Sequence, residues 1–223
     1  MSDPIVNSNP FSTRFVRPGA IPFVFNGGET ARTVVSRLRG QNWWGEIIGR
    51  HGTGKSTLVA ALLPELKSMG GEPRLHSLHD GVVRFEELTA RALRLDAAVV
   101  LIVDGYEQLS LWQKFRVRRA CRRAGCGLVV TAHKPSGLPA LYRTVATPEV
   151  AGRVFATLTA ERPALVTSSD LQQSFAARNG NLREALFDMY DLHEINARNG
   201  ASDQQSEIIA LGPSEQRLPC QTP

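Results

Sequence analysis

Cysteine and long apolar runs are scarce in this chain of 223 residues, and each scarcity excludes a class of protein. Its cysteines, Cys121, Cys126 and Cys220, form neither an even disulfide set nor a zinc-ligand pattern, which favours reduced thiols in the cytoplasm. No apolar run approaches the roughly 20 residues that a membrane-spanning helix needs. The stretch from Met1 to Pro4 lacks a basic start and a long apolar segment, so we expect no signal peptide.

Lysine is also rare, although basic residues are plentiful. The net charge is +5 at pH 7, and only four of the 26 basic residues are lysine. Residues 1–40 carry +3, residues 41–147 carry +6 and residues 148–223 carry −4. An excess of arginine is typical of phosphate and nucleic-acid contacts, and equally of a biased genome composition. With 42% hydrophobic residues, the chain is long enough to bury a sizeable core.

The most informative stretch is a glycine-rich loop at residues 49–56, which matches G-x-x-x-x-G-K-[ST], the phosphate-binding P-loop. An apolar segment precedes it and a helical pattern follows it, as the motif requires. The glycines let backbone N–H groups converge on phosphate oxygens, while Lys55 reaches the β- and γ-phosphates and the Ser56 hydroxyl holds Mg²⁺. We predict that the nucleotide is bound by Gly49, Arg50, His51, Gly52, Thr53, Gly54, Lys55, Ser56 and Thr57.

Apolar strands and helical patterns alternate over residues 29–147, which predicts an α/β fold built on a doubly wound parallel sheet. The clearest strands are the continuous apolar runs from Ala97 to Asp104 and from Gly127 to Thr131, because strands buried on both faces have this pattern. The expected helices are 29–39, 57–69, 85–95 and 109–124, and the other strands begin at Trp43 or cover 73–78 and 142–146.

The two ends differ from this core. Residues 1–28 are rich in Pro, Asn and Gly and predict an extended segment, whose apolar side chains either pack or cover part of the nucleotide's base. Strand patterns stop at Pro148, and helices are expected at 148–159, 170–178 and 182–196. We interpret residues 148–196 as a small acidic helical lid and the polar residues 197–223 as a mostly disordered tail.

A second candidate site follows an apolar strand. Asp104 ends that strand, at the edge where α/β sheets bind ligands, and is predicted to hold Mg²⁺ together with Ser56. Hydrolysis also needs a group that orients or deprotonates the attacking water. Glu107 is favoured over Gln108 because a carboxylate accepts the proton. The alternative is that Glu107 only caps the helix expected from Leu109.

Together these motifs resemble the AAA+ ATPases and the closely related STAND ATPases, over roughly residues 20–196. The segment from Asp104 to Leu109 resembles the STAND form Asp-Gly-apolar-Asp-Glu-Leu, with Gln108 in place of its second acid. Thr131 lies at the family's sensor position, and His133 replaces the arginine of some STAND members. The resemblance implies ATP and Mg²⁺ as ligands.

The same resemblance extends to the lid. Residues 180–186 resemble the start of the AAA+ lid helix, which implies that Arg183 reaches the γ-phosphate. Arg143 lies where these proteins often place an arginine finger directed at a neighbouring subunit, which leaves a homo-oligomer open; the alternative is an ordinary surface arginine. The catalytic set implied by motif and resemblance is Lys55, Glu107, Thr131 and Arg183.

One basic helix has no counterpart in that resemblance. Lys114, Arg116, Arg118, Arg119, Arg122 and Arg123 place six positive charges within ten residues. We expect Leu109, Trp112, Val117, Ala120 and Ala124 to form its buried stripe. The exposed face would then bind nucleic-acid phosphates or an acidic protein, or it is simply a solvated charged face.

The leading functional hypothesis is a Mg²⁺-dependent ATPase that acts as a nucleotide-driven switch or motor through closure of the lid onto the core. A non-hydrolysing ATP-binding scaffold for nucleic acid or a partner protein is the alternative. A small-molecule kinase fits less well, because residues 135–147 are too few for an arginine-rich lid over the phosphates. An ABC-type ATPase lacks its Leu-Ser-Gly-Gly-Gln signature here.

Overall fold

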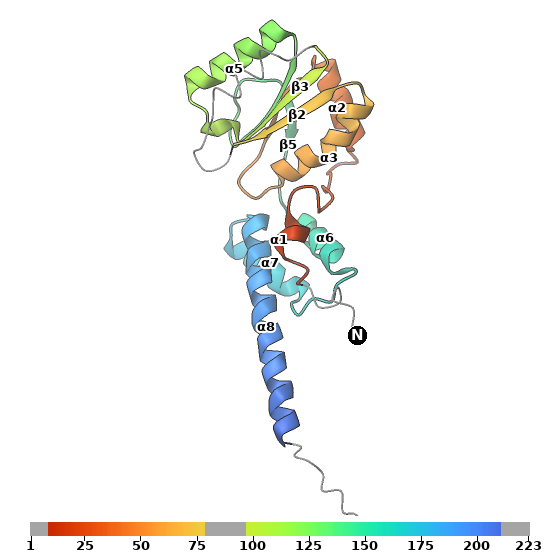
Figure 1. Ribbon diagram of the computed structural model, residues 1–223, viewed down its shortest axis with the longest axis vertical. Coiled ribbons are helices and arrows are strands. Elements are labelled where there is room, and N and C mark those ends of the chain that lie inside the picture. Colours follow the sequence, from red (N-terminus) through yellow and green to blue (C-terminus); the bar gives the residue numbers. More distant parts are fainter. Residues whose placement is uncertain (1–8, 79–96, 211–223) are drawn as a thin grey trace, which may run out of the picture.

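A five-stranded parallel sheet forms the centre of the computed structural model, which describes residues 9–78 and 97–210 (Figure 1). Its strand order is β2-β3-β4-β1-β5, and every pairing is parallel. The predicted α/β fold is confirmed, although the last strand covers 140–143 and not the expected 142–146. The strands are β1 (Trp44–Ile48), β2 (Glu72–Ser77), β3 (Val99–Asp104), β4 (Gly127–Ala132) and β5 (Ala140–Arg143).

Helices cover both faces of the sheet because alternate strand residues point to opposite sides. On one face, Leu101 and Val103 pack in a cluster with α5 (Leu111–Ala124). On the other face, Val100 and Ile102 pack in a cluster with α2 (Ala31–Gly40) and α3 (Lys55–Ser68). The helix predicted at 85–95 lies outside the described residues.

The start of α5 decides between the two interpretations of Glu107. A short 3₁₀ helix, η1 (Tyr106–Gln108), precedes α5, and the N-cap of α5 is Ser110. The Ser110 hydroxyl accepts a hydrogen bond from the backbone N–H of Gln113, and the Gln113 side chain accepts one from the Ser110 N–H. The alternative that Glu107 caps this helix is therefore wrong.

The buried stripe of α5 also differs from the prediction. Val117, Ala120 and Cys121 are buried, whereas Trp112 is 63% exposed. At 3.6 residues per turn, Trp112 lies about 140° around the helix from Val117, so the two cannot both face the sheet. Leu109 is buried, but it lies before the helix begins. The prediction that Trp112 packs in the core is wrong.

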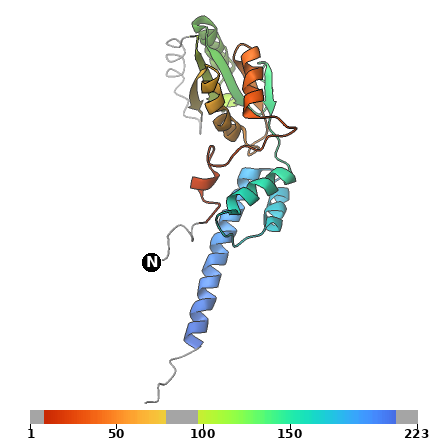
Figure 2. The ribbon, with the colours of Figure 1, turned by 90° about the vertical axis from the view of Figure 1, so that its right-hand side faces the viewer.

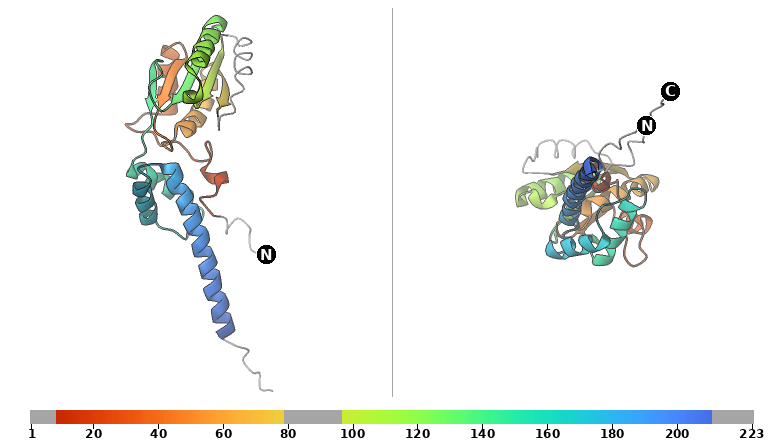
Figure 3. Two further views of the ribbon diagram at one scale, coloured as in Figure 1. Left: turned by 90° about the vertical axis from the view of Figure 1, so that its left-hand side faces the viewer. Right: turned by 90° about the horizontal axis from the view of Figure 1, so that it is seen from below.

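The chain beyond the sheet is helical and forms a second, smaller body, called the lid below. It consists of α6 (Pro148–Thr159), α7 (Ser168–Ala177) and α8 (Leu182–Ala210), which share an apolar cluster that includes Val154, Leu171 and Met189. Figures 1 and 3 show α8 extending well past α6 and α7, away from the sheet. The expected helix end near residue 196 and the expected disorder of 197–210 are corrected, because α8 continues to Ala210.

Residues 9–28, called the N-terminal strap below, run between the two bodies (Figure 2). Phe11 and Ile21 are buried in the cluster of the lid, whereas Phe23 and Phe25 pack against the sheet-side cluster and the Tyr142 ring. The strap contains a short helix, α1 (Thr13–Val16), and has turns or bends over much of the rest, so the expected extended segment is corrected to an irregular one. It thus contributes to both hydrophobic cores.

Among the helices of residues 9–78 and 97–210, none combines the length and the apolar character that crossing a membrane requires.

Candidate nucleotide-binding site

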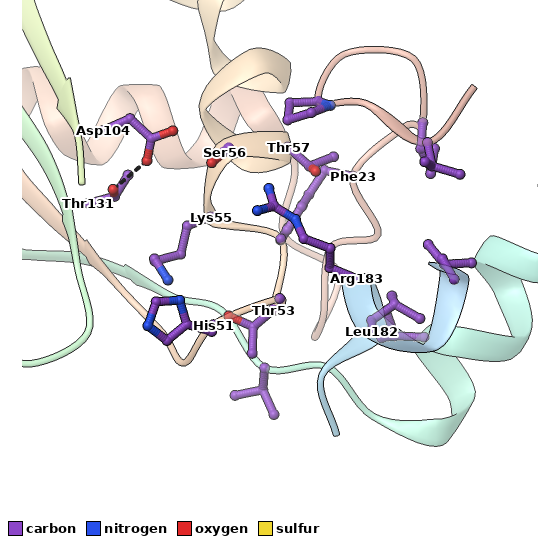
Figure 4. A pocket seen from close by; sticks show the side chains of 18 of the residues that line it. Phe23, His51, Thr53, Lys55, Ser56, Thr57, Asp104, Thr131, Leu182 and Arg183 are labelled. Carbon is purple, nitrogen blue, oxygen red and sulfur yellow. Dashed lines mark hydrogen bonds between the residues drawn. The ribbon is translucent and has the colours of Figure 1, made fainter. Parts of the chain in front are cut away.

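A cavity of about 370 Å³ lies where the carboxyl ends of the strands, the lid and the N-terminal strap meet (Figure 4). Its volume lies within the usual range for small-molecule sites. Parts of the chain that are far apart in the sequence supply its polar wall. That wall includes His51, Gly52, Thr53, Gly54, Lys55, Ser56, Thr57, Asp104, Glu107, Thr131, His133 and Arg183.

The P-loop connects β1 to α3 in the conformation that its glycines permit. Gly52 and Gly54 have φ angles of 70° and 90°, in the left-handed region that side chains disfavour. The Lys55 ammonium group donates hydrogen bonds to the carbonyl oxygens of Gly49 and Arg50, at 2.8 Å and 3.0 Å. Phosphate oxygens can replace these carbonyls, since Lys55 itself lines the cavity.

Close contacts also require glycine at two P-loop positions, Gly49 and Gly52. A Cβ atom at Gly49 would lie 2.0 Å from the Thr144 hydroxyl oxygen, and one at Gly52 would lie 1.7 Å from the Asn181 side-chain oxygen. Asn181 directly precedes α8 and caps it, accepting a hydrogen bond from the Glu184 N–H. The sequence pattern gave no sign of the contact between Asn181 and the P-loop.

Asp104 is held in place by β4. The Thr131 hydroxyl donates a hydrogen bond of 2.5 Å to Asp104 and accepts one from the Gly105 N–H at 2.9 Å. Both Asp104 and Thr131 are buried. The predicted sensor Thr131 therefore orients the carboxylate, and its hydroxyl is already engaged by two partners.

Ser56 and Asp104 offer a suitable pair of ligands for Mg²⁺. Both line the cavity, and Figure 4 shows them on the same side of it. Mg²⁺ prefers oxygen ligands and is usually bound through one or two protein groups plus substrate phosphates and water. Among the described residues no cluster of three or more His, Cys, Asp or Glu side chains that could hold a metal ion occurs.

Glu107 lies beside a pair of histidines. Its Oε1 atom is 3.3 Å from the Nε2 atom of His133, and its Oε2 atom is buried without a hydrogen-bond partner in the described part of the chain. The rings of His133 and His51 have centroids only 3.7 Å apart. One carboxylate oxygen thus contacts His133, while the other is buried.

Burial and neighbouring charges shift two pKa values in this group. Burial lowers the pKa of Lys55, and the positive charge of Arg183 lowers it further, against the opposing effects of Glu107 and Asp104. Burial also lowers the pKa of His133, assisted by Lys55 and His51 and opposed by Glu107. His133 is therefore mainly neutral at pH 7.

The lid and the strap complete the cavity. Arg183 extends from the first turn of α8 toward the P-loop (Figure 4). The remaining wall is apolar and includes Phe23 of the strap and Val150 and Leu182 of the lid. The strap therefore contributes an aromatic ring to the apolar part of the cavity wall.

Other residues that the sequence analysis considered for the site lie outside the cavity or are bound to other parts of the chain. Arg50 is exposed and contributes its carbonyl oxygen to the loop, and Gly49 is buried behind it. The Gln108 amide donates a hydrogen bond to the Leu78 carbonyl oxygen at 2.5 Å. Arg143 is exposed at the end of β5, on a separate shallow surface.

Comparison with known proteins supports the fold but gives no close relative. No protein-family model and no curated protein matches the sequence. Three structures of RuvB variants from Thermotoga maritima match with TM-scores of 0.52, 0.51 and 0.53, at 16%, 17% and 16% sequence identity. The matches cover 71%, 71% and 73% of this chain, but only 57%, 57% and 61% of the RuvB chains. This chain shares its fold with these RuvB structures and spans less than two thirds of the RuvB length.

Proposed function

We propose that this chain, which has the fold of the AAA+ P-loop ATPases, binds ATP with Mg²⁺ in the cavity between core and lid and hydrolyses it as a nucleotide-driven switch. One observation carries the proposal: a single cavity brings Lys55, Ser56, Asp104, Glu107 and Arg183 together. The buried thiols of Cys121 and Cys126 suit a reducing compartment, so we assign the protein to the cytoplasm.

Binding would use opposite ends of the cavity for opposite ends of ATP. The P-loop amides and Lys55 bind the phosphates, and the apolar wall around Phe23 and Leu182 takes the adenine. Ser56 and Asp104 would hold Mg²⁺, which would supply positive charge to the bound phosphates. The Thr131 hydrogen bond keeps the Asp104 carboxylate oriented for this task.

Glu107 is the proposed general base. Glu107 lines the cavity, and its Oε1 atom lies 3.3 Å from the Nε2 atom of His133. Glu107 accepts the proton of the attacking water as the bond between the β,γ-bridging oxygen and the γ-phosphorus breaks. Arg183 would stabilise the charge that develops on the phosphoryl oxygens.

Closure of the lid would couple ATP hydrolysis to a change in the position of the lid relative to the core. Asn181 already lies against the P-loop at Gly52, and Arg183 is two residues further along the same chain. A γ-phosphate that contacts both Lys55 and Arg183 would therefore stabilise the closed arrangement of core and lid. Loss of the γ-phosphate would remove these contacts and allow the lid to open.

Phosphate release from ATP tests the proposal directly. The full chain should release phosphate above background in the presence of Mg²⁺, and Lys55→Ala should abolish turnover because it removes the cation that contacts the phosphates. Glu107→Gln should retain ATP binding but lose at least roughly 100-fold in kcat, the usual scale of general-base catalysis. Arg39→Gln on the exposed surface of α2 serves as the control and should leave turnover unchanged.

A non-hydrolysing ATP-binding protein is the second candidate. The observation that favours it is Gln108, which replaces an acid of the STAND pattern and is bound to the Leu78 carbonyl. Saturable ATP binding that Lys55→Ala removes, without phosphate release by the unaltered chain, would support this alternative and contradict hydrolysis.

A further inference from the structure

A second hollow, of about 510 Å³, lies on the outer side of α5, on a different part of the surface from the nucleotide cavity. It runs between α5 and the loop that joins β4 to β5. Leu111 and Phe115 line one end, arginines line the other, and Ser136 contributes from the loop. Figure 1 shows α5 on the side of the sheet remote from the lid. This surface is called the α5 groove below.

The basic residues of α5 divide into anchored and available side chains. Arg118 donates hydrogen bonds to the Tyr106 hydroxyl oxygen, at 3.2 Å, and to the Ser136 carbonyl oxygen, so it forms the floor of the groove. Arg122 lies over the Trp44 ring, 5.4 Å from its centroid. Arg119 and Arg123 are exposed, and within the described residues neither forms an ion pair.

The charge on this helix is uncompensated along its own length. From Leu111 to Ala124 α5 contains no aspartate or glutamate, and Lys114 to Arg123 span about 14 Å at 1.5 Å per residue. A row of cations of this length can contact several phosphates of one strand. It matches an extended polyanion better than a single anion.

Large apolar side chains are exposed beside these arginines. Leu111 is 86% exposed and Phe115 is 60% exposed. Phe115 lies one turn after Leu111 and one turn before the basic end of the groove, so ring and cations line the same hollow. Exposed aromatic rings next to arginines are the surface on which unpaired bases stack while their phosphates are neutralised.

We propose that the α5 groove binds single-stranded nucleic acid, with phosphates on Arg119, Arg122 and Arg123 and a base on Phe115. A duplex fits less well, because its bases are stacked on one another and cannot cover the ring. An acidic peptide would satisfy the charges but has no comparable use for an exposed aromatic ring. DNA and RNA share the chemistry recognised here, and this inference is independent of the proposed ATPase activity.

Fluorescence anisotropy of the full chain, without nucleotide, tests the inference. The probes are a labelled single-stranded DNA and a single-stranded RNA of about 16 nucleotides, a size within known single-strand sites, and the matching DNA duplex. Arg119→Gln with Arg123→Gln should weaken single-strand binding and lower the slope of log affinity against log salt by about 1.4, since each phosphate contact contributes about 0.7. Phe115→Ala should weaken binding roughly tenfold with the slope unchanged.

Matched controls make the result decisive. Arg32→Gln with Arg39→Gln removes two exposed charges from α2, on the opposite face of the sheet, and should leave single-strand binding almost unchanged. Lys55→Ala should also leave it unchanged, which separates this surface from the nucleotide cavity. Absence of single-strand binding, an equal loss in the α2 pair, or duplex binding that Phe115→Ala does not alter would overturn the proposal. Tighter binding of an acidic peptide at the same residues would overturn it in favour of a protein partner.

Discussion

His133 lies between charges of opposite sign, and its titration reports on both. Its pKa is lowered by burial and by Lys55, and it is raised by Glu107. Glu107→Gln should therefore lower the pKa of His133 further, whereas Lys55→Met should raise it. NMR titration of the imidazole resonances measures both shifts, and Arg32→Gln on α2 is the control. Shifts of the same sign in the two variants would contradict the proximity of His133 to both groups.

The same shift links His133 to stability. Because burial holds the native pKa of His133 below its ordinary value of 6.5, the unfolded chain binds the proton first as the pH falls. The contribution of neutral His133 to the free energy of unfolding is complete above pH 6.5. It is lost as the pH falls from 6.5 through the native pKa of His133. Replacement by Gln removes this part of the pH dependence, because Gln does not titrate.

Gly52 combines backbone conformation with close contact, and a second glycine separates the two effects. Gly28 has a φ of 75° with nothing within 4 Å of an added Cβ, whereas Gly52 has a φ of 70° and Asn181 at 1.7 Å. Gly28→Ala should cost about 1 to 2 kcal/mol, the strain of a left-handed residue, and should leave ATP affinity intact. Gly52→Ala should carry the same strain and also lose ATP binding, because the lid must shift.

Denaturant unfolding and ATP titration of both variants test this difference. Asn181→Gly in the Gly52→Ala background should restore part of the binding, since it removes the colliding oxygen while the strain remains. Equal ATP affinity in the two alanine variants would contradict the contact between lid and P-loop.

Among the helices, α5 carries a hydrogen-bonded arginine and an exposed arginine at adjacent positions. Arg118 donates to the Tyr106 hydroxyl and the Ser136 carbonyl, and the adjacent Arg119 is exposed. Arg118→Ala should cost about 1.5 to 3 kcal/mol, because hydrogen bonds from a charged donor are lost. Arg119→Ala should stay within about 0.5 kcal/mol. Chemical denaturation compares the pair, and similar costs would contradict the structural role of Arg118.

The burial of β3 was predicted correctly and that of Trp112 was not, because the two predictions depend on different features of the apolar pattern. A continuous apolar run such as Val99 to Val103 predicts a buried strand because every residue is apolar, so its register is immaterial. A helix stripe depends on the angle of each residue around the axis, and in α5 Trp112 lies about 140° from the buried Val117. In a helix this rich in arginine, an apolar side chain has no local signal that distinguishes packing from exposure.

For the whole molecule, local patterns predicted what lies within one element and missed what joins distant ones. The P-loop, the buried strands and the site carboxylates Asp104 and Glu107 follow from spacing and polarity, which the sequence displays directly. The contact of Asn181 with Gly52 and the Glu107–His133 pair connect segments separated by up to 129 positions. No periodicity encodes such contacts, because they depend on the strand order and on where the lid docks.

The N-terminal strap has a practical consequence for how this protein is divided. The sheet and its first long helix begin only after residue 29, so a fragment that starts there retains every motif. Such a fragment would nevertheless lack Phe23 from the cavity wall and Phe11 from the lid cluster, where it contacts Phe155 at a ring distance of 5.7 Å. Removal of residues 9–28 would therefore take aromatic contacts from both the cavity wall and the lid cluster, although these residues carry no recognisable motif.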